Sequence, residues 1–433
     1  MTRKANKKEM REKELYSKAC VAGSIRFVVD EADEESLALE EYENFSRNLA
    51  TILARNTEVV AVRLIPYPNK CEVYISKNNY WLEKDIVYID KIKEYVKSLS
   101  KDAPIKLDDA LEREDVGNLF VDVLEYCSAK IDTRFNKLKD DIKKDIINNQ
   151  QNQHIRSFMD YASINAENID NADGYDLTET CSSYYDEFKS SSAPKKFLRH
   201  IKKVGSYYTA LIDITACACM DKYKLLFSNM HVHKLEPTII RQPMFSWKNI
   251  VKRYIPDPDH AKYEKFKKIC LNDSYTLQRL IDTYGNADDG LNDESIKQDI
   301  YLHAEMNLLT NIIDQKYKGR AFIAVSKRSC YLCELFIRFV NKKGYNIFFT
   351  SGAHKKLYSR WLLPKMKDPD LRTESLNYMI KQLDQVINEE IAKHVSIVAR
   401  SDSNGESVKS GTNPNIRKKG GSLIKAKNPK RKI

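Results

Sequence analysis

The segment His303-Ala304-Glu305, followed by Ser329-Cys330-Tyr331-Leu332-Cys333, decides how this chain is interpreted. Cys330 lies 25 positions after Glu305. One imidazole and two thiols are ligands of the kind that bind zinc, and three protein ligands leave a fourth tetrahedral position for water. A carboxylate two residues after the histidine is placed to carry the protons of that water. The pattern therefore predicts a catalytic zinc centre, with His303, Cys330 and Cys333 as ligands and Glu305 as proton shuttle.

The sequence around the motif predicts alternating helices and strands. Helical spacing is expected for residues 295–315 and 330–342, and short apolar strands for residues 321–325 and 345–350. Such alternation is typical of parallel strands joined by crossover helices that pack on a sheet. Cys330 and Cys333 would share one face of a first helical turn, with Ser329 as the N-cap. The positive end of that helix would favour the thiolates that bind metal.

These residues resemble the cytidine deaminase-like superfamily, whose signature joins H-x-E to P-C-x-x-C. Ser329 replaces the proline, which is similar to a branch with a serine-cysteine-x-x-cysteine form found in fungi and some bacteria. Residues 350–354, 356–358 and 361–364 add to this likeness, which covers about residues 297–366. The resemblance implies an α/β fold: a three-layer deaminase-like core, made of a mixed sheet with helices on both faces, beside a large mainly helical region. It also implies Zn²⁺ as the cofactor.

Candidate substrate-binding residues follow from the resemblance and from position. In related deaminases an asparagine that closes the second strand contacts the nucleoside, which implies such a role for Asn78. His354, Tyr358 and Trp361 come after the second motif strand, on the side where a substrate pocket is expected. Aromatic rings there can stack on a base, which is worth on the order of 1–3 kcal/mol per base. For Tyr358 and Trp361, packing in the core is an equally good interpretation.

The remaining chain divides into segments of different character. A deaminase core normally has a helix and a β-hairpin before its H-A-E helix, and residues 32–79 have this order. They are either the first part of a split deaminase domain or an independent α/β element. The expected segments are a basic disordered lead-in at 1–20, the helix and hairpin at 32–79, a helical insertion or domain at 88–285, a deaminase-like zinc domain at 295–396, and a basic disordered tail at 401–433.

Composition narrows the class of protein. The 433 residues are 42% hydrophobic, which fits a folded chain, and nine cysteines at irregular spacing indicate a reducing compartment. The net charge is +11: residues 1–20 contribute +4 and residues 401–433 contribute +7, so residues 21–400 are formally neutral. The basic tails are interpreted as a nucleic-acid contact, a nuclear-import signal, or solvated ends.

The leading functional hypothesis is a zinc-dependent hydrolytic deaminase that acts on a cytosine or adenine base in a nucleotide or nucleic acid. The partner would be a nucleobase-containing substrate, with single-stranded nucleic acid held through the basic tails. The alternative is a non-catalytic deaminase-like zinc domain that serves as a protein- or nucleic-acid-binding scaffold, with a protein partner on the helical region. The sequence has no apolar run of membrane-spanning length and no secretory signal, so nucleus or cytoplasm is expected.

Overall fold

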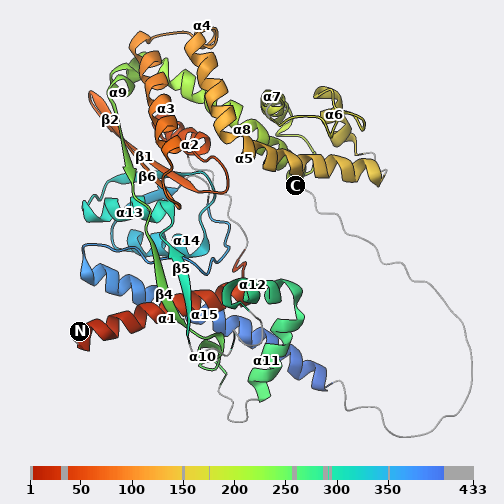
Figure 1. The fold of residues 1–433 in the computed structure, drawn as a ribbon, viewed down its shortest axis with the longest axis vertical. Coiled ribbons are helices and arrows are strands. Elements are labelled where there is room, and N and C mark those ends of the chain that lie inside the picture. Colours follow the sequence, from red (N-terminus) through yellow and green to blue (C-terminus); the bar gives the residue numbers. More distant parts are fainter. Residues whose placement is uncertain are drawn as a thin grey trace, which may run out of the picture.

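A computed structural model describes residues 3–30, 38–148, 152–174, 176–255, 261–285, 291, 295–349 and 352–403. The fold is α/β, as predicted, with a five-stranded mixed sheet and many helices (Figure 1). Within the described residues, no helix combines the length and the apolar character needed to cross a bilayer.

The central sheet joins strands from distant parts of the chain. Its order is β3-β2-β1-β6-β7. The strands are β1 (Val60–Tyr67), β2 (Lys70–Lys77), β3 (Met230–Leu235), β6 (Arg320–Val325) and β7 (Asn346–Phe349). β1 runs antiparallel to both β2 and β6, whereas the β2–β3 and β6–β7 pairs are parallel. The hairpin of residues 60–77 therefore lies in the same sheet as the two strands that flank the second half of the motif.

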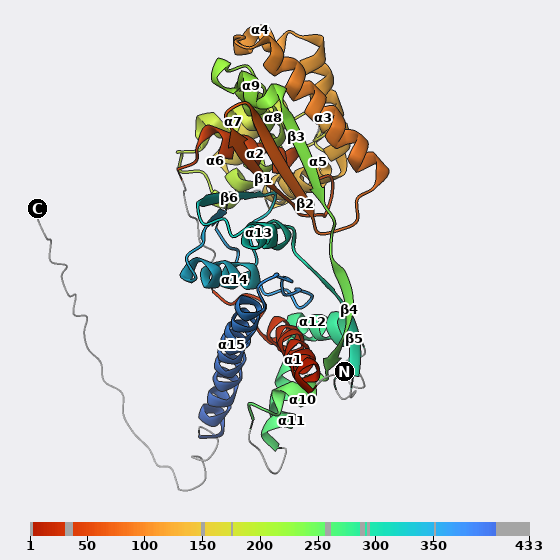
Figure 2. The same cartoon turned by 90° about the vertical axis from the view of Figure 1, so that its left-hand side faces the viewer.

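Alternation along the strands gives the sheet two buried faces. In β6, Ile323 and Val325 enter one hydrophobic cluster, and Phe322 and Ala324 enter the other. The first cluster is shared with α13 (Ala304–Asp314) and α14 (Tyr331–Lys342). The second is shared with α2 (Glu41–Ile52), α3 (Glu83–Asp102) and α8 (Lys195–Ala218). Helices on both faces make the predicted three-layer core, which Figure 2 shows with α13 and α14 below the sheet.

Residues 88–285 are less uniformly helical than predicted. Most of this span forms helices or helical turns: α4 (Leu107–Leu111), α5 (Glu114–Ile147), α6 (Gln153–Tyr161), α7 (Thr178–Phe188), a 3-10 turn (Asp221–Tyr223) and α9 (Lys224–Ser228). Two strands interrupt these helices. β3 is the edge strand beside β2, and β4 (Ile239–Phe245) pairs antiparallel with β5 (Ser295–Tyr301). Strand partners that lie far away in sequence leave no local helix or strand signal, which is why these strands were missed.

The prediction of a disordered lead-in at residues 1–20 is wrong. α1 (Arg3–Ile25) is a long helix whose residues Leu15, Tyr16 and Ala19 are buried. It packs against α15 (Pro369–Ser403), α10 (Trp247–Val251) and α12 (Ser274–Tyr284), near α11 (Ala261–Asn272) (Figure 2). Its apolar positions are hidden in the sequence among seven basic residues. Of the predicted tail, residues 401–403 lie in α15 and residues 404–433 lie outside the described part.

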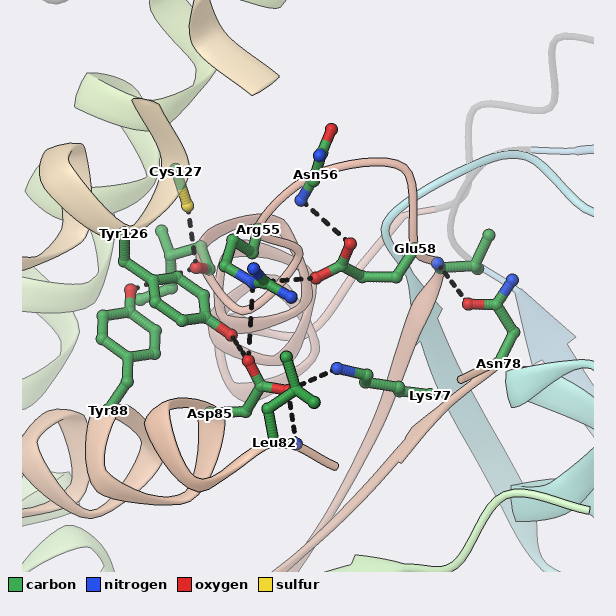
Figure 3. Close-up of polar contacts among 12 residues, drawn as sticks. Arg55, Asn56, Glu58, Lys77, Asn78, Leu82, Asp85, Tyr88, Tyr126 and Cys127 are labelled. Atoms are coloured by element: carbon green, nitrogen blue, oxygen red, sulfur yellow. Dashed lines mark hydrogen bonds and ion pairs between the residues drawn. The ribbon is translucent and has the colours of Figure 1, made fainter. Parts of the chain in front are cut away.

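A buried ionic cluster fastens the hairpin to the helical layer (Figure 3). The Asp85 carboxylate on α3 contacts the Lys77 ammonium at the end of β2 and lies 3.5 Å from Arg55 Nε. Tyr126 of α5 donates its hydroxyl to Asp85 at 2.9 Å. Burial opposes ionisation of Asp85, but the bond from Lys77 and the other donors lower the pKa of this carboxyl group.

Asp85→Asn should destabilise the protein by about 3–5 kcal/mol, because it leaves the buried Lys77 ammonium without a counter-charge. Urea denaturation measures the loss. Since the pKa of Asp85 is lowered in the folded state, its stabilisation is present at neutral pH and disappears as pH falls through that folded pKa. Asp90→Asn, on an exposed position of the same helix, is the control. An equal loss of unfolding free energy in both variants would contradict a stabilising role for the buried Asp85–Lys77 ion pair.

Candidate metal centre

His303 lies at the junction of a strand and a helix. β5 ends at Tyr301, and His303 is the N-cap of α13 with extended backbone angles. The prediction of one helix over residues 295–315 is therefore wrong for its first part, because residues 295–301 pair with β4. As a consequence His303 stands at the open end of α13, and its side chain is only partly buried.

The two cysteines lie at the start of α14. Cys330, rather than the predicted Ser329, is the N-cap, and its Sγ accepts a hydrogen bond from the Cys333 amide at 3.4 Å. Cys333 follows in the first turn, and both thiols are buried. Ser329 instead bridges through its backbone to the loop after β7, because its amide donates to Gly352 O and its carbonyl accepts from the His354 amide.

The three predicted ligands converge. His303 Nδ1 lies 3.2 Å from Cys333 Sγ and 3.6 Å from Cys330 Sγ. The three candidate ligand atoms lie within 4.8 Å of one another, and among the described residues no other such group of His, Cys, Asp or Glu is found. Side chains from the N-termini of two neighbouring helices thus form a compact group that could hold a metal ion.

The electrostatics of the group favour a cation. Burial disfavours a charged His303, but the adjacent Cys330 thiolate outweighs it and raises the pKa of His303 to about 9. Burial likewise opposes ionisation of Cys330, yet hydrogen bonds from Cys333 and the charge of His303 lower its pKa well below the usual value. Burial and the Cys330 thiolate raise the pKa of Cys333. An imidazolium and a thiolate held together in this way share a proton that a metal ion can replace.

Glu305 is a buried carboxylate beside this group. It lies in the first turn of α13 and is 3% exposed. Its Oε2 atom has no hydrogen-bond partner among the described residues. Burial raises the pKa of Glu305, against the opposing charge of His303. An unpaired buried carboxylate oxygen is costly and is rarely kept without a task, which fits a group that accepts and returns protons.

Aromatic residues after β7 adjoin His303. The ring of Tyr358 is 41% exposed and lies edge-on to His303, with 6.2 Å between ring centroids. His354 contacts the same tyrosine edge-on at 5.7 Å, and burial lowers the pKa of His354. Phe27, which follows α1, packs against Tyr358 at 5.8 Å and was not anticipated, since nothing in the sequence links residue 27 to the motif. Because the ring of Tyr358 lies beside His303 and the ring of His354 lies beside Tyr358, both residues remain candidate substrate contacts.

Trp361 lies in the core, which was one of the two interpretations of its position in the sequence. The side chain is fully buried against Phe336, and its indole N–H is donated to Cys333 Sγ at 3.3 Å. A ring enclosed in this way supports a ligand of the candidate centre, a role that the sequence analysis missed. The spacing of 28 residues from Cys333 to Trp361 carried no signal of that bond.

Asn78 closes the hairpin at the end of β2. Its side-chain Oδ1 accepts a hydrogen bond from the Val59 amide at 2.9 Å, and its own amide donates to Val59 O (Figure 3). Nearby, Asn307 of α13 donates to Ser76 Oγ at 3.1 Å, so this end of the hairpin faces the helix that begins at His303. The carbonyl oxygen of Asn78 is thus engaged with the backbone, and its contact with substrate stays a prediction.

The segment that carries the candidate metal centre resembles a known protein family. Residues 302–365 match the model of the OTT_1508-like deaminase family. This segment is similar to a deaminase, and we refer to it as the deaminase-like domain. It contains His303, Glu305, Cys330 and Cys333, and the resemblance to the cytidine deaminase-like superfamily is confirmed for it. No curated protein and no solved structure matches the chain.

Proposed function

We propose that the deaminase-like domain is a zinc-dependent hydrolase that removes the amino group of a cytosine or adenine base in a nucleotide or nucleic acid. The observation that carries this proposal is the buried, unpaired Oε2 of Glu305 beside the group of His303, Cys330 and Cys333. Metal ligands alone would also suit a structural site. A buried carboxylate beside them, with one oxygen that lacks a hydrogen-bond partner among the described residues, suits proton transfer.

The residues fit zinc by their chemistry. One imidazole and two thiols are the donor set of a catalytic zinc site with an open fourth position, and thiolate ligands favour zinc over magnesium or calcium. The low pKa of Cys330 supplies one thiolate, and the indole N–H of Trp361 gives the sulfur of Cys333 a hydrogen-bond donor. When bound, zinc would act as a Lewis acid and lower the pKa of a water molecule in the open fourth position.

The chain's own residues then account for the proton transfers. Glu305 takes a proton from the attacking water at its carboxylate and delivers it to the ring nitrogen. The same carboxylate carries the water's second proton to the amino group, which leaves as ammonia while the ring carbon keeps the oxygen. The raised pKa of Glu305 suits this cycle, because its carboxylate must bind a proton as well as release it.

We also infer that the catalytic unit is assembled from two separate segments of the chain. Ala61 and Val62 of β1 pair with Val325 and Ala324 of β6, five residues before Cys330. The helix and hairpin of residues 41–77 then supply the elements that precede the H-A-E helix in a deaminase core, and residues 88–285 form an insertion. The neighbouring α13 contacts β1 and β2 directly, which supports this assembly.

The proposal is tested with the full chain, purified and loaded with zinc, on a panel of cytosine and adenine substrates. The panel includes free bases, nucleosides, nucleotides, and single-stranded RNA and DNA. Release of ammonia with conversion of one base to its oxo form is expected. A chain with a filled metal site that converts no member of the panel would reject the enzymatic proposal and favour the scaffold alternative.

Trp361→Phe should weaken zinc binding by about 10–100-fold, because the phenyl ring keeps most of the packing but cannot donate to Cys333. Competition against a fluorescent zinc chelator measures the affinity. Trp247→Phe is the matched control, since Trp247 is also fully buried and its indole nitrogen has no hydrogen-bond partner among the described residues. Equal zinc affinity in the two variants would contradict a positioning role for Trp361.

A further inference from the structure

A group of like charges lies beside the deaminase-like domain. It comes from α5, α8 and the loop of residues 326–329 that leads into Cys330. We name it the basic cluster, and its members are Lys130, Arg134, Lys137, Lys203, Lys327 and Arg328. It belongs to the part of the chain that is formally neutral overall, so these cations are concentrated by the fold and not by the basic tails.

One hydrogen bond joins α5 to α8, and another fixes the loop of residues 326–329 to Thr57. Lys130, Arg134 and Lys137 recur at helical spacing and share one face of α5. Arg134 Nη1 donates to the backbone oxygen of Lys203 at 2.8 Å, which joins α5 to α8. Lys327, three residues before Cys330, donates its Nζ to Thr57 O at 2.6 Å.

The charges of the basic cluster lie close enough to shift one another's pKa values. Partial burial and four neighbouring cations, among them Lys137 and Arg328, lower the pKa of Lys203. Burial lowers the pKa of Lys327, with Arg134 and Lys137 adding to the effect. The acid that faces Lys130 and Lys327 is Glu58, which already accepts from the Asn56 amide at 3.0 Å and lies 3.6 Å from Arg55 Nε (Figure 3).

Lys130 is the innermost member. Its side chain is more than nine-tenths buried, and its Nζ atom has no hydrogen-bond partner in the described part of the chain. Burial, with the charges of Arg134 and Lys327, lowers the pKa of Lys130 to about 7. A buried amine without a hydrogen-bond partner is costly to ionise, and a bound anion would offset that cost.

We propose that the basic cluster binds the phosphate backbone of a single-stranded nucleic acid and directs it past the candidate metal centre. The inference rests on the proposed function and names its substrate class. Lys130 to Lys137 span about 10 Å along α5, more than a single phosphate group covers. The loop that carries Lys327 and Arg328 continues directly into Cys330, so a strand held there passes the reacting group. Deaminases reach a base only when it is unpaired and unstacked, which favours a single strand.

The test measures binding of a fluorescently labelled single-stranded oligonucleotide to the zinc-loaded full chain by anisotropy, across a range of salt concentrations. Lys137→Gln/Lys203→Gln removes two exposed cations of the basic cluster. This double variant should bind severalfold more weakly, and the slope of log affinity against log salt should fall by about 1.4. Lys268→Gln/Lys381→Gln, at exposed positions on α11 and α15, is the matched control and should bind like the wild type.

A third variant separates binding from structure. Lys130→Met should weaken oligonucleotide binding and raise the temperature of thermal unfolding, because methionine fills the buried site without a charge. A lysine that served only the fold would give the opposite change in stability. Lower thermal stability of Lys130→Met, or unchanged binding by it, would count against the inference.

Three outcomes would overturn the inference. They are unchanged binding by the Lys137→Gln/Lys203→Gln variant, an equal loss in the matched control, and wild-type binding of a mononucleotide as tight as that of the oligonucleotide. Failure of the proposed function looks different. In that case the oligonucleotide binds through the basic cluster, but no base is deaminated by the zinc-loaded chain.

Discussion

Glu305→Gln should lower the rate of base deamination by about 10²–10⁴-fold while the chain keeps its bound zinc. Glutamine has nearly the same size as glutamate but cannot accept and return a proton. The position is buried and the Oε2 atom has no hydrogen-bond partner among the described residues, so a neutral side chain should not destabilise the fold. The measurement is ammonia release under saturating substrate, together with metal analysis of the same preparation.

The control for Glu305→Gln is oligonucleotide binding and thermal unfolding of the same variant. Both should equal those of the wild type, because glutamine has nearly the size of glutamate and Glu305 is not a member of the basic cluster. A variant that kept full activity would remove Glu305 from the mechanism. A variant that lost zinc together with activity would mean that the carboxylate supports the metal and not the proton transfer.

Cys333→Ser should reduce the zinc content from about one ion per chain to near none and abolish activity. A buried hydroxyl is a far weaker zinc ligand than a thiolate, and this sulfur also receives the bond from Trp361. Because metal binding contributes directly to folding, thermal stability should fall as well, and a chelator should lower the stability of the wild type to a similar extent. Elemental analysis and thermal unfolding measure both effects.

The matched control is Cys270→Ser, which changes a buried thiol on α11 outside the group of three. It should keep its zinc and its activity. Full zinc content in Cys333→Ser would refute the ligand assignment, and loss of zinc in both variants would point to unfolding as the cause.

The residues of the candidate site could be predicted from the sequence because they lie in short segments. His303 and Glu305 are two residues apart, and Cys330 and Cys333 occupy one helical turn, so local spacing brings together the side chains within each pair. The strand of residues 321–325 was also predictable, since its apolar residues are buried on both faces of the sheet.

Other parts could not be predicted, because their partners are remote. Residues 295–301 form a strand only in combination with β4, and α1 is ordered by α15, some 350 residues later. The indole of Trp361 is a donor to Cys333 only because the chain after β7 returns over α14. Packing of this kind overrides local propensity and leaves no periodic signal.

The sequence by itself determined the candidate ligand set, the proposed proton-carrying group and most of the alternation of strand and helix around them. Only the tertiary structure decided that the hairpin of residues 60–77 lies beside β6, that Cys330 caps α14, and that cations from α5, α8 and one loop gather next to the site. The reason is physical. Spacing along a helix or strand is set by local geometry, whereas strand order and the meeting of distant charges depend on which buried surfaces fit together.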